Sequence, residues 1–374
     1  MHLGIMFFSS SDQDGCGGKY DLLREVARFA DRKGFRSIWT PERHFHEFGG
    51  LFPNPAVTSA ALATITERIQ IRAGSLISPL HDPLRIAEEW AVVDNLSRGR
   101  VAISFGSGWN MDDFVFFPER YAVRQKVMYE GIETVRSLWR GETITRRNSG
   151  DRPTVVATRP RPVQEELPVW VTSSGNVETY ISAGRIGANL LTHLVGQDLE
   201  KLAEKIRRYR GARAEAGFDP GLGIVSLMLH TFIGPDLDAV RETVRRPFQQ
   251  YIRSAISLEM KAAASGGAIS GGHRIENHEI PTDAMQDLLD VSFERYFRTA
   301  ALMGTPETCL GFVHELEAIG VDEIACLVDF GVDADSVLGG MEYLNQLRDK
   351  VCPLRESAAS ASMLNDFNEV LEEF

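Results

Sequence analysis

Residues 40–50 of the sequence, TPERHFHEFGG, combine two histidines, two carboxylates and an arginine with aromatic residues. They follow a short apolar run that is typical of a buried strand. In a parallel α/β barrel the active site lies where the strands end, and a histidine placed there can exchange a proton near neutral pH. We therefore expect His44 to take part in proton transfer. The residues alone equally allow His44 to do no more than hydrogen-bond a strand end.

Three other predicted strand ends carry small residues, at 73–75, 106–108 and 173–175. Glycine and serine let a flat ligand approach the backbone closely. The Gly-x-Gly turn at 106–108 resembles a phosphate loop but lacks the dinucleotide spacing and a Walker lysine. Residues 173–175 lead into a predicted helix, whose free N–H groups can bind an anion. Plain turns and an ordinary serine N-cap are the alternatives.

Short apolar runs alternate with amphipathic helical stretches along most of the chain, which indicates βα units around a parallel sheet. Eight strands are predicted, at 4–9, 37–40, 69–75, 101–105, 169–173, 188–193, 224–233 and 323–328. Helices are predicted at 20–33, 54–66, 83–97, 121–140, 176–184, 199–216 and 305–319. This number of units favours an α/β fold of the closed (β/α)8 TIM barrel type, with insertions, over an open sheet.

The predicted barrel forms a single domain over residues 1–355 and departs from regularity in three places. Residues 141–167 form an insertion with a hairpin around 148–150, because an Asn-Ser-Gly turn lies between polar runs. Residues 262–282 are rich in glycine and weakly hydrophobic, which is typical of a mobile lid or a disordered loop. A C-terminal tail follows over 356–374, and its last eleven residues can form one amphipathic helix.

The 374 residues carry a formal net charge of −12, which disfavours binding to nucleic acid or to anionic membranes. The four cysteines (Cys16, Cys309, Cys326, Cys352) show no CxxC spacing, so we expect reduced thiols and no metal site. We find no secretory signal and no apolar run long enough to span a membrane. The expected location is the cytoplasm.

Several motifs together resemble those of the bacterial luciferase-like flavin monooxygenases. The motifs in the first half are ERHFHEFG at 42–49, NP at 54–55, HDP at 81–83, RIAE at 85–88, LSRGR at 96–100 and FGSGWNMDDF at 105–114. Those in the second half are LWRG at 138–141, PVWVTSSG at 168–175, AGRIGAN at 183–189, GTPE at 304–307 and GVDE at 320–323. The chain looks most like the branch of this family that serves polyketide and nonribosomal-peptide natural product biosynthesis.

The resemblance implies a two-component monooxygenase. It would bind FMN in the reduced form (FMNH2) supplied by a separate flavin reductase, and would use O2 through a C4a-hydroperoxyflavin to hydroxylate a substrate. His44 matches the family's active-site histidine, and a cis peptide is expected at Gly74–Ser75. The cofactor-binding residues implied are Gly74, Ser75, Gly106, Ser107, Arg124, Ser173, Ser174, Gly175 and Thr192. Because Ser107 stands where the luciferases have an arginine, either Arg124 or Arg185 is expected to balance the phosphate charge.

Two other functions remain open on the sequence. An oxidoreductase of the same fold could use the deazaflavin F420 and transfer hydride, and a relative without catalysis could simply bind flavin. For the monooxygenase, the substrate is expected to be a small molecule, either free or held on a carrier protein. A homodimer is expected through the helical ranges 54–66 and 83–96, which are rich in Ala, Ile and Val.

Overall fold

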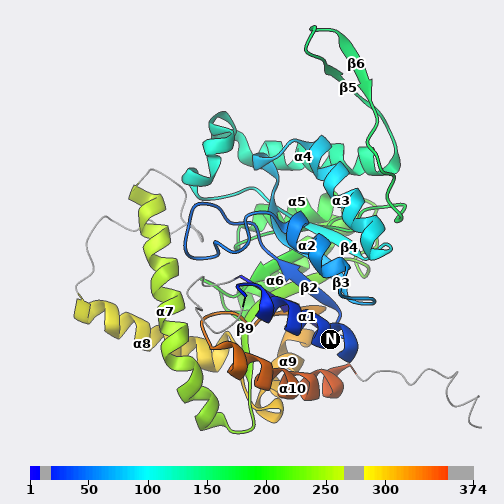
Figure 1. Ribbon diagram of the computed structural model, residues 1–374. Helices are drawn as coiled ribbons and strands as arrows, with labels where there is room; N and C mark the ends of the chain where they lie inside the picture. The colour runs from blue at the N-terminus through cyan, green and yellow to red at the C-terminus, as the bar shows by residue number, and fades with distance from the viewer. Residues whose placement is uncertain (9–17, 265–281, 353–374) are drawn as a thin grey trace, which may run out of the picture.

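The computed structural model describes residues 1–8, 18–264 and 282–352, and its centre is a closed barrel of eight parallel strands (Figure 1). The strands are β1 (His2–Met6), β2 (Ser37–Thr40), β3 (Gln70–Ile77), β4 (Val101–Gly106), β7 (Val169–Thr172), β8 (Asn189–His193), β9 (Val225–Ile233) and β11 (Glu323–Leu327). They pair in the order β9-β11-β1-β2-β3-β4-β7-β8, and a β8–β9 pairing closes the ring. The predicted (β/α)8 barrel and all eight of its strands are confirmed.

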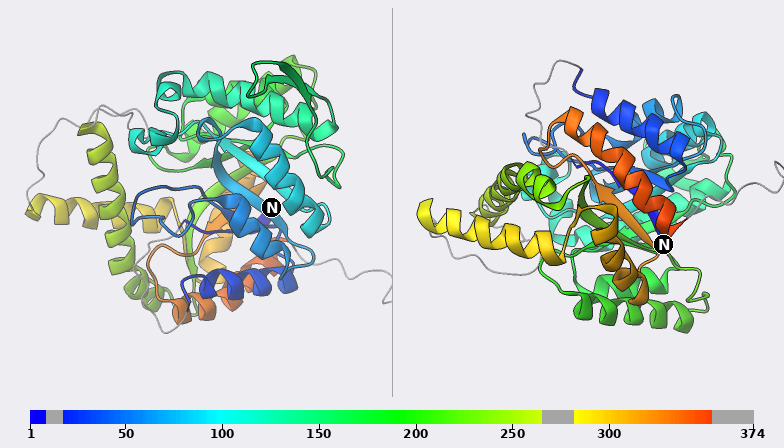
Figure 2. Two further views of the ribbon diagram at one scale, coloured as in Figure 1. Left: turned by 45° about the horizontal axis from the view of Figure 1, so that its top comes forward. Right: turned by 90° about the horizontal axis from the view of Figure 1, so that it is seen from below.

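Helices surround the barrel on the outside (Figures 1 and 2). Their bounds are α1 (Asp21–Lys33), α2 (Pro55–Ala63), α3 (Pro83–Ser97), α4 (Arg124–Arg140), α5 (Val177–Arg185), α6 (Leu199–Glu215), α7 (Leu237–Ala264), α8 (Thr282–Thr299), α9 (Pro306–Ala318) and α10 (Ala334–Val351). Short 3-10 turns are η1 (Ser78–Leu80), η2 (Met111–Phe116) and η3 (Pro118–Val123). Local chemistry sets several starts: Asn54, Asp82 and Asn176 each accept a backbone N–H at the N-cap of α2, α3 and α5.

Four elements were not predicted. Strand β10 (Leu302–Gly304) pairs with the end of β9 beyond the barrel ring. Helices α7 and α8 pack against each other at one side of the barrel (Figure 2), and α10 lies beside α1 and α9. The range 262–282, which was predicted as a glycine-rich loop, includes helical residues at both ends, since α7 continues to Ala264 and α8 begins at Thr282. Residues 265–281 and 353–374, with the predicted mobile loop and tail helix, lie outside the described residues.

The insertion between α4 and β7 contains the hairpin predicted from its turn residues. Strands β5 (Ile144–Arg147) and β6 (Pro153–Val156) pair antiparallel and project away from the barrel (Figure 1). The Asn148 side chain accepts hydrogen bonds from the backbone of Gly150 and Arg152, which closes the turn.

A buried ion pair crosses the inside of the barrel. Arg72 on β3 donates to Glu323 on β11 at 2.8 Å, and the Arg72 guanidinium lies between the rings of Trp39 (4.7 Å) and Trp170 (4.2 Å). Ser37 also donates to the Glu323 carboxylate. Both charges are therefore compensated inside the barrel, which is the condition for burying them without a large loss of stability.

Three cysteines are described, and all are free thiols. None of the described helices is long and apolar enough to cross a membrane.

Candidate functional site

Glu42 lies after β2 at the carboxyl end of the barrel and holds two histidines. Its carboxylate Oε1 pairs with Nε2 of His44 at 2.9 Å and with Nε2 of His81 at 2.6 Å, and Oε2 accepts the backbone N–H of Ile77 at 2.6 Å. The Glu42 side chain is fully buried, whereas His44 remains 10% exposed. His44 is thus fixed on one nitrogen and faces the barrel mouth with its remaining surface.

The charges of this group depend on one another. Burial alone would raise the pKa of Glu42, but hydrogen bonds from His44, His81 and Ile77 outweigh it and lower that pKa below its usual value. Burial alone would lower the pKa of His81, but the bond to Glu42 raises it. Glu42 therefore stays ionised and favours the protonated form of His81.

A surface of small residues lies next to this group, at the ends of β3 and β4. The peptide bond between Gly74 and Ser75 is cis, as expected. A Cβ placed at Gly106 would lie 3.3 Å from the Ser75 Cβ, so the two strand ends are in contact there. The Ser75 hydroxyl bonds to Thr172 Oγ1 at 2.8 Å, which joins this surface to β7. Glycine and serine at these strand ends are the residue types that let a flat ring approach the backbone closely.

A polar recess follows at the start of α5. Gly175 has a φ of +115°, and a Cβ there would come 3.3 Å from Lys205 Nζ. Lys205, which comes from α6, donates to the Gln197 side chain at 2.8 Å. No carboxylate among the described residues lies within ion-pairing distance of Lys205. The recess therefore combines the positive end of α5, the hydroxyl of Ser173 and an ammonium group without an acidic partner.

The other residues predicted to bind the cofactor occupy different surroundings. Arg124 donates to the carbonyls of Gly108 and Tyr121, next to Ser107. Thr192 is buried and its hydroxyl bonds to Tyr180 at 2.6 Å. Arg185, the other residue expected to balance the phosphate charge, is exposed in the last turn of α5, at the opposite end of the helix from residues 173–175. Lys205 was missed because nothing in the sequence near 205 indicates that α6 brings it to Gly175.

Asp113 and Arg43 are two further charged groups near His44. Asp113 lies on η2 and accepts a hydrogen bond from Asn110 at 2.9 Å. Burial raises the pKa of Asp113 to about 6, although the charges of His44 and Arg43 act in the opposite direction. The Arg43 guanidinium lies over the rings of Phe8 (4.1 Å) and Phe48 (5.3 Å).

The inner wall of the mouth, on the side of β9 and β11, is aromatic. His230 on β9 is buried, and its ring lies 4.6 Å from Tyr251, 4.9 Å from Phe248 and 5.7 Å from Phe330. Its Nε2 has no hydrogen-bond partner among the residues that the structure describes, and desolvation lowers the pKa of His230 to about 3. This histidine is neutral and adds a polar atom to an otherwise apolar wall.

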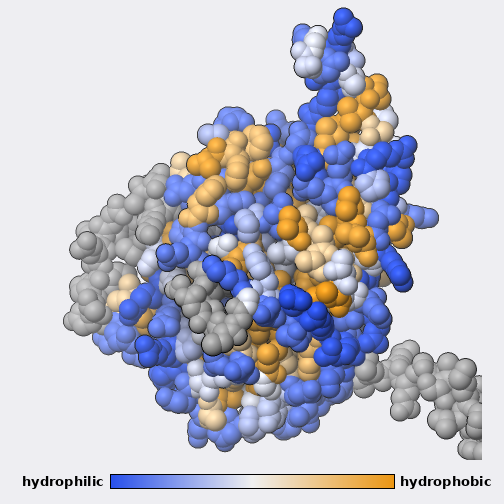
Figure 3. All heavy atoms as spheres, viewed as in Figure 1, coloured by the Kyte–Doolittle hydropathy of each residue, from blue (hydrophilic) through white to orange (hydrophobic). Residues whose placement is uncertain are grey.

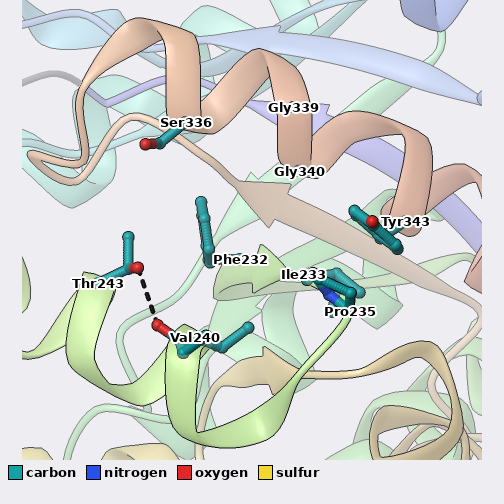
Figure 4. Close-up of a pocket in the computed structure, with 11 residues that line it drawn as sticks. Phe232, Ile233, Pro235, Val240, Thr243, Ser336, Gly339, Gly340 and Tyr343 are labelled. Atoms are coloured by element: carbon teal, nitrogen blue, oxygen red, sulfur yellow. Dashed lines mark hydrogen bonds between the residues drawn. The ribbon is translucent and has the colours of Figure 1, made fainter.

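A separate groove of about 190 Å³ lies outside the barrel, between the β9–α7 connection and α10 (Figure 4). Its lining is apolar or hydroxylic, including Phe232, Pro235, Val240, Gly340 and Tyr343. It contains no histidine, carboxylate or basic residue. The groove therefore does not offer the proton-transfer groups found around His44.

The family model described as luciferase-like monooxygenase matches residues 1–323. The chain is 25% identical over 344 residues to the oxygenase component of flavin-dependent trigonelline monooxygenase from Acinetobacter baylyi, covering 89% of this chain and 90% of that protein. It is 23% identical over 308 residues to the FMNH2-dependent dimethylsulfone monooxygenase of Pseudomonas putida, covering 81% and 82% of the two chains.

Two solved structures show the same fold. Monooxygenase RslO1 from Streptomyces bottropensis superposes with a TM-score of 0.73 at 23% identity, over 92% of this chain and 98% of that one. The FMN-bound oxygenating constituent of 3,6-diketocamphane monooxygenase from Pseudomonas putida gives 0.72 at 16% identity, over 92% and 97%.

Proposed function

The chain belongs to the luciferase-like monooxygenase family, and from this we propose that it is the oxygenase component of a two-component enzyme that uses FMNH2 from a separate flavin reductase. The observation that carries the proposal is the arrangement along the barrel mouth: His44 on Glu42, then the Gly74–Ser75 surface, then the recess at Gly175. A proton-transfer group, a flat surface and an anion recess in this order suit an enzyme that holds a flavin and a substrate together.

The residues present fit FMN. Gly74, Ser75 and Gly106 would lie along the ring, where their small side chains let the backbone come close to it. Ser173, Ser174 and Gly175 would bind the phosphate with the N–H groups of α5, and Lys205 would supply the balancing charge. Ser107 and Arg124 would border the ring. Thr192 would contribute indirectly, through its hydrogen bond to Tyr180. When bound, reduced FMN supplies the electrons that activate O2.

His44 has the role of moving or holding a proton beside the reacting group. Its Nε2 is committed to Glu42, so Nδ1 is the atom that can exchange a proton with flavin or substrate. The rings of Phe45 and Phe116 pack against the imidazole, at 5.6 and 5.1 Å between ring centres, and against each other at 5.6 Å, so they cover part of the His44 ring.

Stopped-flow absorbance tests the proposal. FMNH2-loaded protein is mixed with O2, and a transient flavin absorbance distinct from free oxidised FMN is expected in the wild type and a shorter-lived one in His44→Ala. The matched control is His314→Ala, which changes an exposed histidine on α9 and is expected to behave as the wild type. If the wild type does not bind FMNH2, the monooxygenase is rejected in favour of F420-dependent hydride transfer. If it binds FMNH2 but gives no transient, the monooxygenase is rejected in favour of flavin binding without catalysis.

The phosphate recess is tested by comparing FMN with riboflavin. Lys205→Met is expected to weaken FMN binding about 10- to 100-fold, the usual effect of losing a hydrogen bond to a charged group, and to leave riboflavin binding unchanged. Lys201→Met, one turn earlier on α6 and paired with Asp198, is the control and is expected to affect neither ligand. Equal effects of the two variants would remove Lys205 from the site.

We also propose a homodimer in the cytoplasm that acts on a free or carrier-bound natural-product intermediate. Apolar side chains gather over α2 and α3 in the face shown in Figure 3, among them the exposed Val57, Val92 and Leu96. Burying them against a second copy would remove this apolar area from water. Light scattering after size exclusion should give twice the chain mass for the wild type and the single mass for Val57→Glu with Leu96→Glu. A monomeric wild type would refute the dimer.

A further inference from the structure

Arg43 is a half-buried cation at the mouth of the candidate active site, and the carboxylate of Asp113 acts on it without forming a salt bridge. Its guanidinium lies over Phe8 and Phe48, but within residues 1–8, 18–264 and 282–352 it makes no ion pair and donates no hydrogen bond. Only its backbone N–H is bonded, to the Phe52 carbonyl. A buried or half-buried charge is normally paired, so this one calls for a partner that the described residues do not supply.

Two other arginines that stack on aromatic rings, Arg120 and Arg124, do donate hydrogen bonds. Arg120 also stacks on a ring, Phe117, yet its guanidinium donates to the carbonyls of Pro79 and His81. Arg124 stacks on Tyr121 and donates to two carbonyls as well. Stacking therefore does not prevent hydrogen bonding in this part of the molecule. Of these three arginines, only Arg43 has a guanidinium that donates no hydrogen bond to the described residues.

A glycine at position 49 makes room for the Arg43 side chain. Gly49 has a φ of +85°, and a Cβ there would lie 2.7 Å from Arg43 Cδ and 2.9 Å from its Cγ. Any side chain at position 49 would displace the arginine from its position over Phe8 and Phe48. The loop after β2 is thus shaped around an arginine whose donors remain unused.

The surroundings favour an anion and a flat, apolar body attached to it. Glu42 is already shared between His44, His81 and Ile77, so it does not neutralise Arg43. From Phe48 a series of rings continues inward through Tyr251 (5.0 Å) to His230 (4.6 Å). An arginine fork binds a planar carboxylate with two parallel hydrogen bonds, and aromatic walls accept a planar ring.

We propose that Arg43 binds a carboxylate of the substrate, and that the substrate of this site is a carboxylate-bearing molecule with a planar, apolar body. The inference rests on the proposed function, since it assigns the substrate side of the same site. Arg43 is then a binding residue that sets specificity and orients the substrate toward His44.

Isothermal titration of FMN-loaded protein with benzoate and with its neutral isostere benzamide tests the assignment. The wild type is expected to bind benzoate more tightly than benzamide. Arg43→Met should weaken benzoate about 10- to 100-fold and leave benzamide within about twofold, because only the charge-assisted bonds are lost. The benzoate affinity of Arg43→Lys should lie between those of the wild type and Arg43→Met, since an ammonium keeps the charge but cannot form two parallel hydrogen bonds.

The control is Arg241→Met on α7. Arg241 also lies over a ring, Phe297 (5.4 Å), but is paired with Glu294, and its loss should not alter either affinity. Equal wild-type affinities for benzoate and benzamide, no binding of either, or an equal loss of both in Arg43→Met would overturn the proposal.

Two further readouts keep the test independent of folding and of the proposed function. Arg43→Met should melt at or above the wild-type temperature, because it removes an unpaired charge, whereas a structural arginine would lower it. If Arg43→Met fails to fold, Arg43→Lys and the wild-type preference for benzoate still decide. FMN binding and the oxygen reaction are measured on the same samples, so failure of flavin chemistry is seen separately from failure of carboxylate binding.

Discussion

Replacing Glu42 with glutamine should lower the stability of the protein. The change keeps the shape of the side chain but removes its charge. Three groups bond to the carboxylate, at 2.6 Å (Ile77 N–H), 2.6 Å (His81 Nε2) and 2.9 Å (His44 Nε2). The amide offers one acceptor oxygen in place of two, so its NH2 group must face at least one former donor.

The size of the loss follows from these contacts. A hydrogen bond to a charged group contributes about 1 kcal/mol more than a neutral one, so three such bonds amount to about 3 kcal/mol. An amide is less costly to bury than a carboxylate, which offsets part of this and leaves a net loss of about 2 kcal/mol in the free energy of unfolding.

The loss should depend on pH in a defined direction. The pKa of Glu42 is lowered in the folded protein from its ordinary value of 4.5, so its contribution is complete above that value and is lost as the pH falls through the folded pKa. The pKa of His81 is raised from 6.5, so its contribution is complete below that value and is lost as the pH rises through the folded pKa. The difference between wild type and Glu42→Gln should therefore be largest between pH 4.5 and 6.5.

Urea unfolding followed by circular dichroism at several pH values measures this difference. Glu204→Gln is the control, because Glu204 is an exposed carboxylate paired with Arg208 on α6 and should change stability by less than about 0.5 kcal/mol. A Glu42→Gln protein as stable as the wild type, or a difference that stays constant across the pH range, would refute the reasoning.

Two further predictions concern the barrel and its loops. Arg72→Met should cost about 3–5 kcal/mol in urea unfolding, because it leaves Glu323 buried and unpaired, and adding Glu323→Leu should recover most of that loss. Gly108→Ala should lower the melting temperature more than Gly196→Ala. Both glycines have positive φ (+76° and +73°), but a Cβ at 108 would lie 2.9 Å from Ile77 while a Cβ at 196 meets nothing within 4 Å. Equal shifts would show that backbone strain alone decides the cost.

The barrel could be predicted because its strands carry a local signal. The run Ser-Ile-Trp-Thr at 37–40 has β-branched and aromatic residues and lies between Arg36 and Pro41, and β2 has the predicted bounds. The Asn-Ser-Gly turn at 148–150 similarly gave the hairpin. Strand β10 was missed because three residues are too few for a periodic pattern. Helix α7 was missed because Pro247 interrupts a polar, weakly periodic stretch that nevertheless continues as a helix.

The candidate site divides in the same way. His44 and Gly74–Ser75 lie in motifs that are recognisable from neighbouring residues. Lys205 and Arg43 cannot be recognised in this way, because their roles depend on which residues they contact in the folded chain. Lys205 reaches Gly175 only through the packing of α6 on α5, and Arg43 lies over Phe8 and Phe48, which come from other parts of the chain. Such long-range facts have no local signature in a single sequence.

The charges at the mouth lead to one more prediction, on the pH dependence of anion binding. Asp113 titrates at about 6, and the groups that act on it are His44, Arg43, Asn110 and Glu42. When ionised, Asp113 competes with a substrate carboxylate for the field of Arg43, and a bound carboxylate in turn raises the pKa of Asp113, so binding takes up a proton. Benzoate should therefore bind more tightly at pH 5.5 than at pH 7.5, while benzamide should not change. In Asp113→Asn the benzoate affinity should be high and nearly constant over this range. A pH dependence that persists unchanged in Asp113→Asn would mean that another group, not Asp113, opposes the anion at Arg43.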